Sequence, residues 1–454
     1  MSIIKDSVWQ FLQGMGETQV SKHNPLLLTW LISNLTKAGK LFFDSYNIGA
    51  FFYNLFQFVF FSYVFSYSLV ILYRLKIRKL YINCVLAVYC LCPLIIGYIG
   101  VCIKDTIYSV AFLLFIISLY EMRLSEIEFK RFNSVFYKIN FAISGFYIIT
   151  LRKEGKYVFL FMALIALVLS QKSNFKKILI LLLIIFLASE MVDTVIYKSY
   201  NEVATVAEAS PREALSVPLQ QVARLVSQHG DDISNPDKEI IDKVLVYDTL
   251  SERYNPMLSD PVKNYYCWNS DVTEDDVILF FKIWFKYGLK YPFTYLSATL
   301  NQNYPLFSLN YNDAIYYNSC ELKFWEIDQL FIKDVDSIEK VDSVFINCYK
   351  LEHQMPFLEL IANRSFWCIA LVIFSTIGIK RRDKWHLIIM LPLWATLFIC
   401  ILGPAVNGHP RYVFPIVYSM PFIIASFLCK NPILDCIDIN WSNIIKKQCL
   451  RKRS

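Results

Sequence analysis

The chain has 454 residues, of which 56% are hydrophobic and 16% aromatic, while only 18% are charged. A soluble protein of this composition would have too little polar surface to face water, so the sequence predicts a polytopic membrane protein. The net charge of +7 does not indicate nucleic-acid binding, because the basic residues form short runs between apolar segments, as cytoplasmic loops do.

Residues 1–46 are expected to form an extracytoplasmic N-terminal loop that contains an interfacial helix. Residues 1–23 are of mixed polarity and lack the apolar run of a cleavable signal peptide. The apolar patch within residues 24–43 is too short to cross a bilayer, which favours a helix that lies along the membrane surface.

Two groups of apolar runs predict an all-α transmembrane bundle of about nine spans. Residues 47–196 hold the first group of six, and residues 363–429 hold the second group of three. The predicted spans are residues 47–73, 81–101, 105–122, 134–150, 156–171, 177–196, 363–379, 385–403 and 411–429.

The distribution of lysine and arginine predicts how these spans are oriented. In the nine-span arrangement the basic runs all fall on one side of the membrane, which the positive-inside rule makes cytoplasmic. These runs are Arg74–Lys79, Arg123–Arg131, Lys172–Lys177, Lys380–Lys384 and Lys446–Arg453. The N-terminus is therefore expected outside, and residues 430–454 are expected to be a basic cytoplasmic tail.

Residues 197–362 fall outside in the same arrangement and are long enough for a domain. They hold about 25 acidic residues against about 14 basic ones, in contrast to the basic remainder of the chain. Helical periodicity in Ala214–Gln228 and Asp237–Leu250 predicts a mainly helical extracytoplasmic loop domain that caps the outer end of the bundle.

One helix of this domain is expected over Ala214–Gln228, where apolar residues recur at spacings of three and four. These residues are Leu215, Leu219, Val222 and Val226. The polar side chains elsewhere on this helix face either substrate or water. They are Gln220, Gln221 and Arg224.

The 12 cysteines follow no metal-ligand spacing. Most of them lie within apolar runs, where they pack as small hydrophobic residues. No metal site is therefore predicted. The sequence does not identify a cofactor. A divalent cation is one candidate, since it would bind a carboxylate that lies near a phosphate.

Polar side chains gather on the outer side of the predicted bundle, against the positive-inside bias. Three outer turns and the N-terminal loop carry Lys104 and Asp105; Arg152 and Lys153; Asn407, His409 and Arg411; and Asp6, Gln10 and His23. Arginine and lysine are the usual ligands of phosphate groups, and a carboxylate among them suits a general base. The pattern predicts a site for a lipid-linked phosphate substrate.

Each of these residues also has a simpler explanation. Asp6 fits an ordinary solvated side chain, and Asp105 fits the first turn of a helix, where it stabilises the helix dipole. Arg152 and Lys153 suit nonspecific binding of anionic headgroups, and Arg411 suits an arginine that reaches the headgroups from the end of a span. The gathering of several segments on one face, rather than any one residue, favours the substrate site.

Several motifs occur in order along nearly the whole chain. They are Asp6–Gln10 with Ser21–Thr29, Lys104–Tyr108, Leu151–Tyr157, Leu215–Arg224, Tyr254–Lys263 and Asn407–Pro415. Together they resemble the GT-C-fold glycosyltransferases and, more narrowly, an uncharacterised bacterial multi-span family known only as a domain of unknown function. GT-C proteins place a transmembrane helix before the first outer loop, whereas this sequence opens almost at Asp6, so the anchoring of that loop stays open.

The resemblance implies a GT-C-like bundle and a transferase that uses a polyprenyl-phosphate-linked sugar. In GT-C enzymes an acidic residue of the first outer loop assists the acceptor, and Asp6 matches it. The cations that hold the lipid phosphate are matched by Lys104, Arg152, Lys153 and Arg411.

The function expected from the sequence is hexosyl or pentosyl transfer on the outer face of a bacterial plasma membrane. The sugar would move from a polyprenyl-phosphate carrier to a cell-surface glycan or a lipid-linked acceptor, with no nucleic-acid partner. One alternative is a polymerase or ligase of surface polysaccharide, which would rely on outer-face arginines more than on an acid. The other is a transporter or flippase, which needs polar groups near the middle of the membrane, whereas the predicted spans are mostly apolar apart from Lys138 and Asn140.

Overall fold

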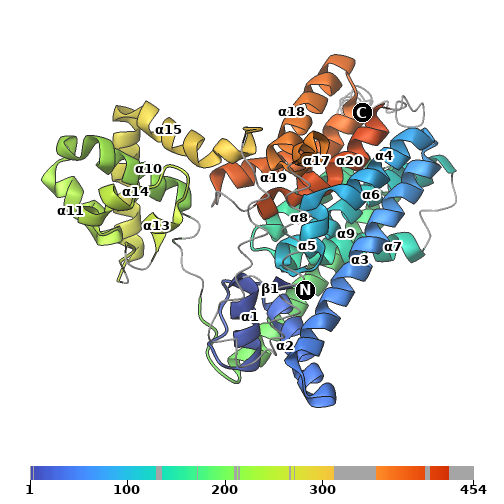
Figure 1. The fold of residues 1–454 in the computed structure, drawn as a ribbon, viewed down its shortest axis with the longest axis horizontal. Coiled ribbons are helices and arrows are strands. Elements are labelled where there is room, and N and C mark those ends of the chain that lie inside the picture. The colour runs from blue at the N-terminus through green and yellow to red at the C-terminus, as the bar shows by residue number, and fades with distance from the viewer. Residues whose placement is uncertain are drawn as a thin grey trace, which may run out of the picture.

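The computed structural model describes residues 2–3, 5–128, 135–170, 172–208, 212, 215–264, 267–269, 271–310, 354–403 and 410–428. The regular structure of these residues is helical, apart from the parallel pairing of β1 (Ser2–Ile3) with β2 (Val101–Cys102). Figure 1 shows two parts, a bundle of long helices and a smaller helical body beside it.

Apolar helices cover the predicted spans. They are α3 (Tyr46–Arg74), α4 (Lys79–Leu91), α5 (Pro93–Ile99), α6 (Lys104–Glu128), α7 (Val135–Leu151), α8 (Gly155–Leu169), α9 (Lys172–Asn201), α18 (Arg364–Arg381), α19 (Lys384–Leu402), η5 (Pro410–Val413) and α20 (Phe414–Leu428). A segment within lipid must bond its backbone groups internally, and a helix does so without any partner strand.

Five of the described helices are long and apolar enough to cross a membrane, and the number rises to seven if each of two bent pairs is one span. The pairs are α4 with α5, bent by 51°, and α17 (Pro356–Ala362) with α18, bent by 77°. Helices α7 and α8 are shorter, at 17 and 15 residues. The described chain is therefore all-α and compatible with a multi-pass membrane protein, while the count of nine spans stays a prediction.

Helix α6 lies at the centre of the bundle, packed against α3, α7, α8 and α20. In its most apolar window 94% of the residues are buried, compared with only 22% in the corresponding window of α9. Exposed side chains along α9 include Leu183, Ile184 and Leu187. A surface this apolar suits lipid better than water.

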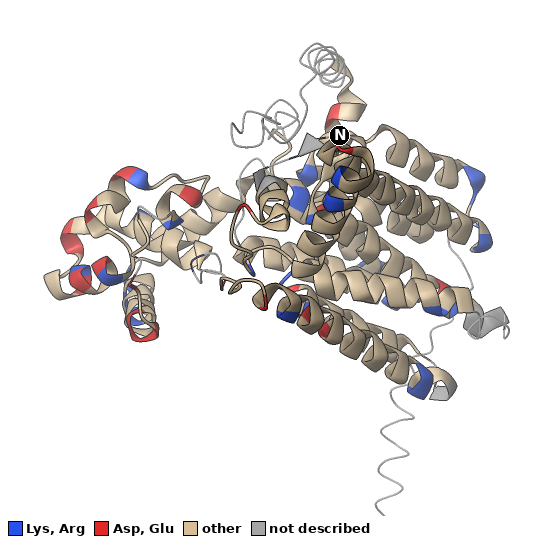
Figure 2. Cartoon of the chain, turned by 90° about the horizontal axis from the view of Figure 1, so that it is seen from below, with Lys and Arg blue, Asp and Glu red and all other residues tan. Residues whose placement is uncertain are grey.

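The helices place the predicted turns at two opposite ends of the bundle. The start of α6, the α7–α8 turn, the end of α9 and η5 lie at one end. At the other end Arg74 lies 4.0 Å from Glu121, and Arg381 lies over the ring of Phe427 at 5.2 Å. Figure 2 shows the lysines and arginines of the long helices concentrated near the helix ends.

The N-terminal segment packs against the first of these ends. It consists of α1 (Lys5–Met15) and α2 (Leu26–Phe43), and α2 covers the patch predicted to form an interfacial helix. Helices α2 and α3 approach so closely that a Cβ added at Gly49 would overlap the carbonyl oxygen of Leu35. Lys22 Nζ lies 2.6 Å from Glu208 Oε1, which joins this segment to the chain that follows α9.

The loop domain has a hydrophobic core of its own. Its helices are α10 (Ser216–His229), α11 (Asn235–Val244), α12 (Tyr247–Arg253), α13 (Asp260–Lys263), α14 (Glu274–Lys290) and α15 (Pro292–Asn303). Buried residues such as Leu219, Val222 and Phe280 form the core. The described part is mainly helical, as the sequence periodicity predicted.

Figure 1 shows the domain apart from the long helices and reached through α15, and its role as a cap stays a prediction. One sequence-based expectation about this domain is wrong. The two glutamines of α10 are buried and Arg224 is half-buried, and all three bond to neighbouring segments of the domain. Gln220 donates to the carbonyl of Asn255, Gln221 accepts from the Trp284 indole at 2.7 Å, and Arg224 Nη1 donates to the Tyr254 hydroxyl at 2.9 Å. Helices α12, α14 and α15 surround α10. The buried surface of α10 therefore includes polar side chains outside its apolar face.

Candidate functional site

A buried carboxylate stands at the end of the bundle where the predicted outer turns gather. Asp105 lies in the first turn of α6 and has an exposed fraction of 0%. The chain before it is held by Gln57 of α3, whose side-chain amide donates to the carbonyls of Ile99 and Val101 at 2.8 and 2.9 Å. Thr106 donates to the Gln57 side-chain oxygen at 2.9 Å. These bonds fix the start of α6, and with it Asp105, against α3.

Arg152, in the turn between α7 and α8, makes the closest contacts with this carboxylate. Its Nε donates to Asp105 Oδ1 at 2.9 Å, and its Nη2 donates to the same oxygen. Its Nη1 donates to Glu154 Oε1 at 3.2 Å. The guanidinium group also lies 4.7 Å from the centre of the Tyr108 ring, a cation–π contact. Arg152 is thus held in one orientation by three neighbours.

Arg411, in η5, brings a second guanidinium group to the other oxygen of Asp105. Its Nε lies 3.6 Å from Asp105 Oδ2, an ion-pair distance that is too long for a hydrogen bond. Oδ2 is buried and accepts no hydrogen bond from the residues that the structure describes. The Tyr412 ring lies near both guanidinium groups, 5.2 Å from that of Arg411 and 5.5 Å from that of Arg152. One carboxylate therefore orients two arginines, the second through charge.

The charge cluster, defined as Lys104, Asp105, Arg152, Glu154 and Arg411, holds three cations and two carboxylates and so carries one net positive charge. Burial lowers the pKa of Arg152, but the carboxylates of Asp105 and Glu154 raise it by more, so this pKa lies above its ordinary value. The guanidinium group therefore stays charged. A half-buried excess of positive charge attracts an anion, and the planar fork of arginine binds phosphate oxygens in pairs.

The structure brings together residues from three of the turns singled out in the sequence. The predicted members of the charge cluster are Lys104, Asp105, Arg152 and Arg411. Lys153 follows Arg152 with an exposed side chain. Asn407 and His409 lie outside the described residues.

The N-terminal segment reaches the same end of the bundle. Strand β1 pairs with β2, which ends two residues before Lys104, and the Ser7 hydroxyl donates to the carbonyl of Cys102. Asp6 precedes Ser7 in α1, and its side chain lies outside what the structure describes. The backbone therefore brings the position of Asp6 to the segment that leads into Asp105.

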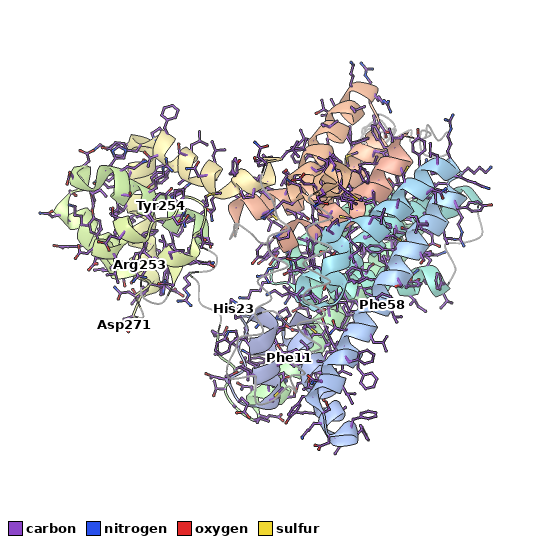
Figure 3. All side chains as sticks on the ribbon, viewed as in Figure 1. Phe11, His23, Phe58, Arg253, Tyr254 and Asp271 are labelled. Carbon is purple, nitrogen blue, oxygen red and sulfur yellow. The ribbon has the colours of Figure 1, made fainter. Side chains whose placement is uncertain are left out.

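Two other predicted residues belong to the packing and the surface of the N-terminal segment. Gln10 is buried and donates to the Thr29 hydroxyl at 3.3 Å, which joins α1 to α2. His23 is exposed at the rim of this segment, as Figure 3 shows.

A second group of charges lies at the same end, between α8 and α9. Lys156 Nζ lies 2.7 Å from Glu190 Oε1, and Asp193 follows one turn later on α9. Both members of the ion pair are partly exposed, so the pair contributes little stability. It extends the charged surface beyond the charge cluster.

The chemistry available at the charge cluster is anion binding. Arg152 takes up one oxygen of Asp105 through hydrogen bonds, and Arg411 takes the other through charge, so this carboxylate is already paired with cations of the protein. In the described part of the chain, no three His, Cys, Asp or Glu side chains are placed to hold a metal ion.

A family model matches residues 10–434 of the chain, and its description is a family of unknown function, DUF6020. The chain belongs to this family. Comparison with curated proteins and comparison with solved structures each found no match. The part that matches DUF6020 contains the charge cluster and the whole of the loop domain.

Sequence reasoning missed several residues of the site. Glu154 was not among the predicted site residues, although its position two residues after Arg152 was a signal. Tyr108 and Tyr412 are close in sequence to Asp105 and Arg411, but nothing local shows that their rings meet guanidinium groups. Gln57 was detectable, because an amide inside an apolar run must find a partner within the bundle.

Proposed function

We propose that this protein is a membrane glycosyltransferase that moves a sugar from a polyprenyl-phosphate carrier to a cell-surface glycan or a lipid-linked acceptor. The observation that carries the proposal is the single buried carboxylate that orients Arg152 and Arg411 within a cluster of net positive charge. This arrangement supports binding of the carrier phosphate. The resemblance of the outer-turn motifs to GT-C enzymes supports the sugar chemistry.

In the proposed reaction an acceptor hydroxyl attacks the anomeric carbon of the sugar. The bond between this carbon and the phosphate oxygen breaks, and its electron pair stays on the polyprenyl phosphate, which is the leaving group. The proton of the hydroxyl passes to the carboxylate of Asp6. Arg152 and Arg411 stabilise the charge that develops on the phosphate, and preoriented cations do this without reorganisation during the reaction.

Asp105 acts in this mechanism as a positioning residue. Its two oxygens face the guanidinium groups of Arg152 and Arg411, and a carboxylate paired with two cations is a weak base. The general base is therefore assigned to Asp6, the match to the GT-C acid.

We further propose that the charge cluster and the loop domain face the outside of a bacterial plasma membrane. The basic turns at the opposite end of the bundle support this orientation. A cysteine introduced at Ser227, which is exposed on α10, should react with an impermeant reagent in intact cells when the native cysteines are replaced. A cysteine introduced at Ser454 should not. The reverse labelling pattern would overturn the orientation.

The function is tested by separate assays of donor binding and sugar transfer, with purified protein and a polyprenyl-phosphate hexose. Arg411→Lys keeps the charge but loses the fork, so donor binding should weaken while some transfer remains. Arg411→Ala should lose more, on the order of a few kcal/mol if water is excluded from the phosphate. Asp6→Asn should bind donor normally and transfer roughly 100-fold more slowly. Arg78→Ala, an exposed arginine before α4, serves as the control with no effect.

A second candidate, a polymerase or ligase of lipid-linked polysaccharide, is favoured by the pair of arginines around an occupied carboxylate. It differs in not requiring Asp6. If Asp6→Asn transfers sugar normally while Arg411→Ala is inactive, the acid-assisted mechanism is wrong and this second candidate replaces it.

A further inference from the structure

A long uncharged segment lies within the otherwise charged loop domain. Residues 291–310 contain no Lys, Arg, Asp or Glu, although the rest of the domain is rich in acidic residues. The segment covers α15 and the short helix η3 (Tyr304–Leu306). The part of the domain surface that these residues form therefore carries no charged side chain.

Helix α15 exposes an apolar stripe along one side. Phe293, Leu296 and Leu300 have exposed fractions of 80%, 53% and 59%, and their spacing of three and four residues places them on one helix face. Tyr295 and Ala298, on another side of α15, are buried against the loop domain. The stripe is therefore a surface of the folded domain and has no partner among the described residues.

The C-terminal end of α15 is fixed to the ends of two membrane-spanning helices. Asn303 Nδ2 donates to the carbonyl of Ile401 in the last turn of α19 at 3.2 Å. Just after η3, the carbonyls of Ser308 and Leu309 accept from Ser365 Oγ and Asn363 Nδ2, each at 2.9 Å, where α18 begins. Helix α15 is thus held where two apolar spans begin or end.

Helix α15 runs across the direction of α3 and α18 (Figure 1). Helix α17 also lies across the direction of α18, because the two helices are bent by 77° relative to each other. Helix α17 also exposes apolar side chains, among them Phe357 and Leu360. Two apolar helices therefore turn sideways at one edge of the bundle, next to the start of the same span.

We propose that α15 lies in the boundary between lipid and water, and that the partner of its apolar stripe is the surface of the bilayer. Helices with an apolar face bury that face at the level of the lipid headgroups. The end of the stripe lies beside two candidate spans, because the C-terminal end of α15 is bonded to α19 and the residues after η3 are bonded to the start of α18. An aqueous position would leave three large apolar side chains in water. This inference needs only a membrane-spanning bundle and does not depend on glycosyl transfer.

The bilayer contact has a consequence for the charge cluster. Helix α19 ends at Leu402, nine residues before Arg411, and Asn303 binds the end of that helix. When α15 rests on lipid, it fixes the position of the loop domain along the membrane normal. The domain is then held beside the turn that carries Arg411.

Photocrosslinking of the full chain in nanodiscs of phosphatidylethanolamine and phosphatidylglycerol tests the proposal. The photoreactive residue p-benzoylphenylalanine is placed at Phe293 or Leu300, at Leu187 on the exposed side of α9 as the lipid reference, and at Glu239 on α11 as the exposed water-facing control. Lipid adducts are counted by mass spectrometry. All four positions are exposed, so the probes should not disturb packing.

The expected result is a lipid adduct at Phe293 and Leu300 comparable to that at Leu187, and at least about ten-fold above that at Glu239. An adduct yield at Phe293 and Leu300 no higher than at Glu239 overturns the proposal. A crosslink from these positions to a second copy of the chain, without lipid adduct, also overturns it, because the stripe is then a protein interface.

Discussion

Each end of the bundle holds a carboxylate beside basic side chains, buried for Asp105 and half-buried for Asp383, and the two differ in how completely the carboxylate is bonded. At the charge-cluster end, Asp105 Oδ2 accepts no hydrogen bond from the described residues and faces Arg411 at 3.6 Å. At the opposite end Asp383 accepts from the backbone N–H of His386 at 3.1 Å and lies 2.7 Å from the ring Nδ1. The other ring nitrogen lies 3.2 Å from the Ser426 hydroxyl.

The difference separates polar groups that maintain the fold from polar groups suited to a ligand. The Asp383–His386–Ser426 group has the composition of a hydrolytic triad, but Ser426 is fully buried and its hydroxyl donates to the carbonyl of Ile423 at 2.8 Å. Its bonds close within the protein, and Asp383 caps the start of α19. The charge cluster instead holds three basic side chains against two carboxylates, and Asp105 Oδ2 accepts no hydrogen bond from the described residues.

The largest loss of stability is expected from Asp105→Ala. This change leaves two buried guanidinium groups without their shared carboxylate, and breaking a buried ion pair from one side costs about 3–5 kcal/mol. The measurement is denaturant unfolding of the purified protein in detergent. Glu154→Gln is the matched control, because Glu154 is partly exposed and should cost about 0–1 kcal/mol. Equal losses for the two variants would contradict the central role of Asp105.

A smaller loss is expected from Gly155→Ala in the turn that carries Arg152. A Cβ at this position overlaps the carbonyl oxygen of Ile148, so the α7–α8 turn must shift, at a cost of about 1–3 kcal/mol. Gly100→Ala is the control, because no atom lies within 4 Å of its added Cβ. Unfolding curves that move equally for both variants would show that the α7–α8 turn tolerates the shift.

His386→Ala tests whether the opposite end is purely structural. It leaves the buried Ser426 hydroxyl and the Asp383 carboxylate each with one partner fewer, which should cost about 1–2 kcal/mol. Donor binding should stay unchanged, in contrast to Arg411→Ala. Loss of donor binding without loss of stability would contradict this division between the two ends.

The smallest effect concerns the pH dependence of stability. Burial raises the pKa of Asp383, but hydrogen bonds from His386 lower it by more, so the net pKa lies below its ordinary value. A carboxyl group of this kind stabilises the fold above its unfolded-state pKa of about 3.9, and this contribution disappears as the pH falls through the folded-state pKa. Asp383→Asn should therefore cost about 1 kcal/mol at pH 7 and less at pH 3. Identical losses at both pH values would argue against the shift.

The apolar runs of the sequence coincide with helices, the structure that bonds its backbone groups internally as lipid requires. The break in the second predicted span, 81–101, was not foreseen. Pro93 was a local signal, since proline disfavours a helical conformation at the residue before it. Gln57 holds the other end of α5 through the carbonyls of Ile99 and Val101, and such a long-range contact is not visible in the local sequence.

Sequence topology grouped Lys104, Asp105, Arg152 and Arg411 correctly at one end, because alternate turns of a bundle share an end. It did not show that Asp105 is the centre of the group. That role follows from the burial of α6 among four helices, which depends on three-dimensional packing. The prediction that the glutamines of α10 face substrate or water was wrong for the same reason, since periodicity within one helix does not reveal how many neighbours surround it.

The two arginines become available to Asp105 at different times during synthesis. Arg152 follows Asp105 by 47 residues, whereas Arg411 follows it by about 300, which at 5–20 residues per second is a delay of roughly 15–60 s. During this interval the carboxylate and Arg152 form a neutral pair in the growing chain. Synthesis of η5 then adds the second guanidinium group and gives the cluster its positive charge. The charge cluster is thus completed only by the last part of the chain that the structure describes, so a chain whose biosynthesis stops earlier lacks Arg411.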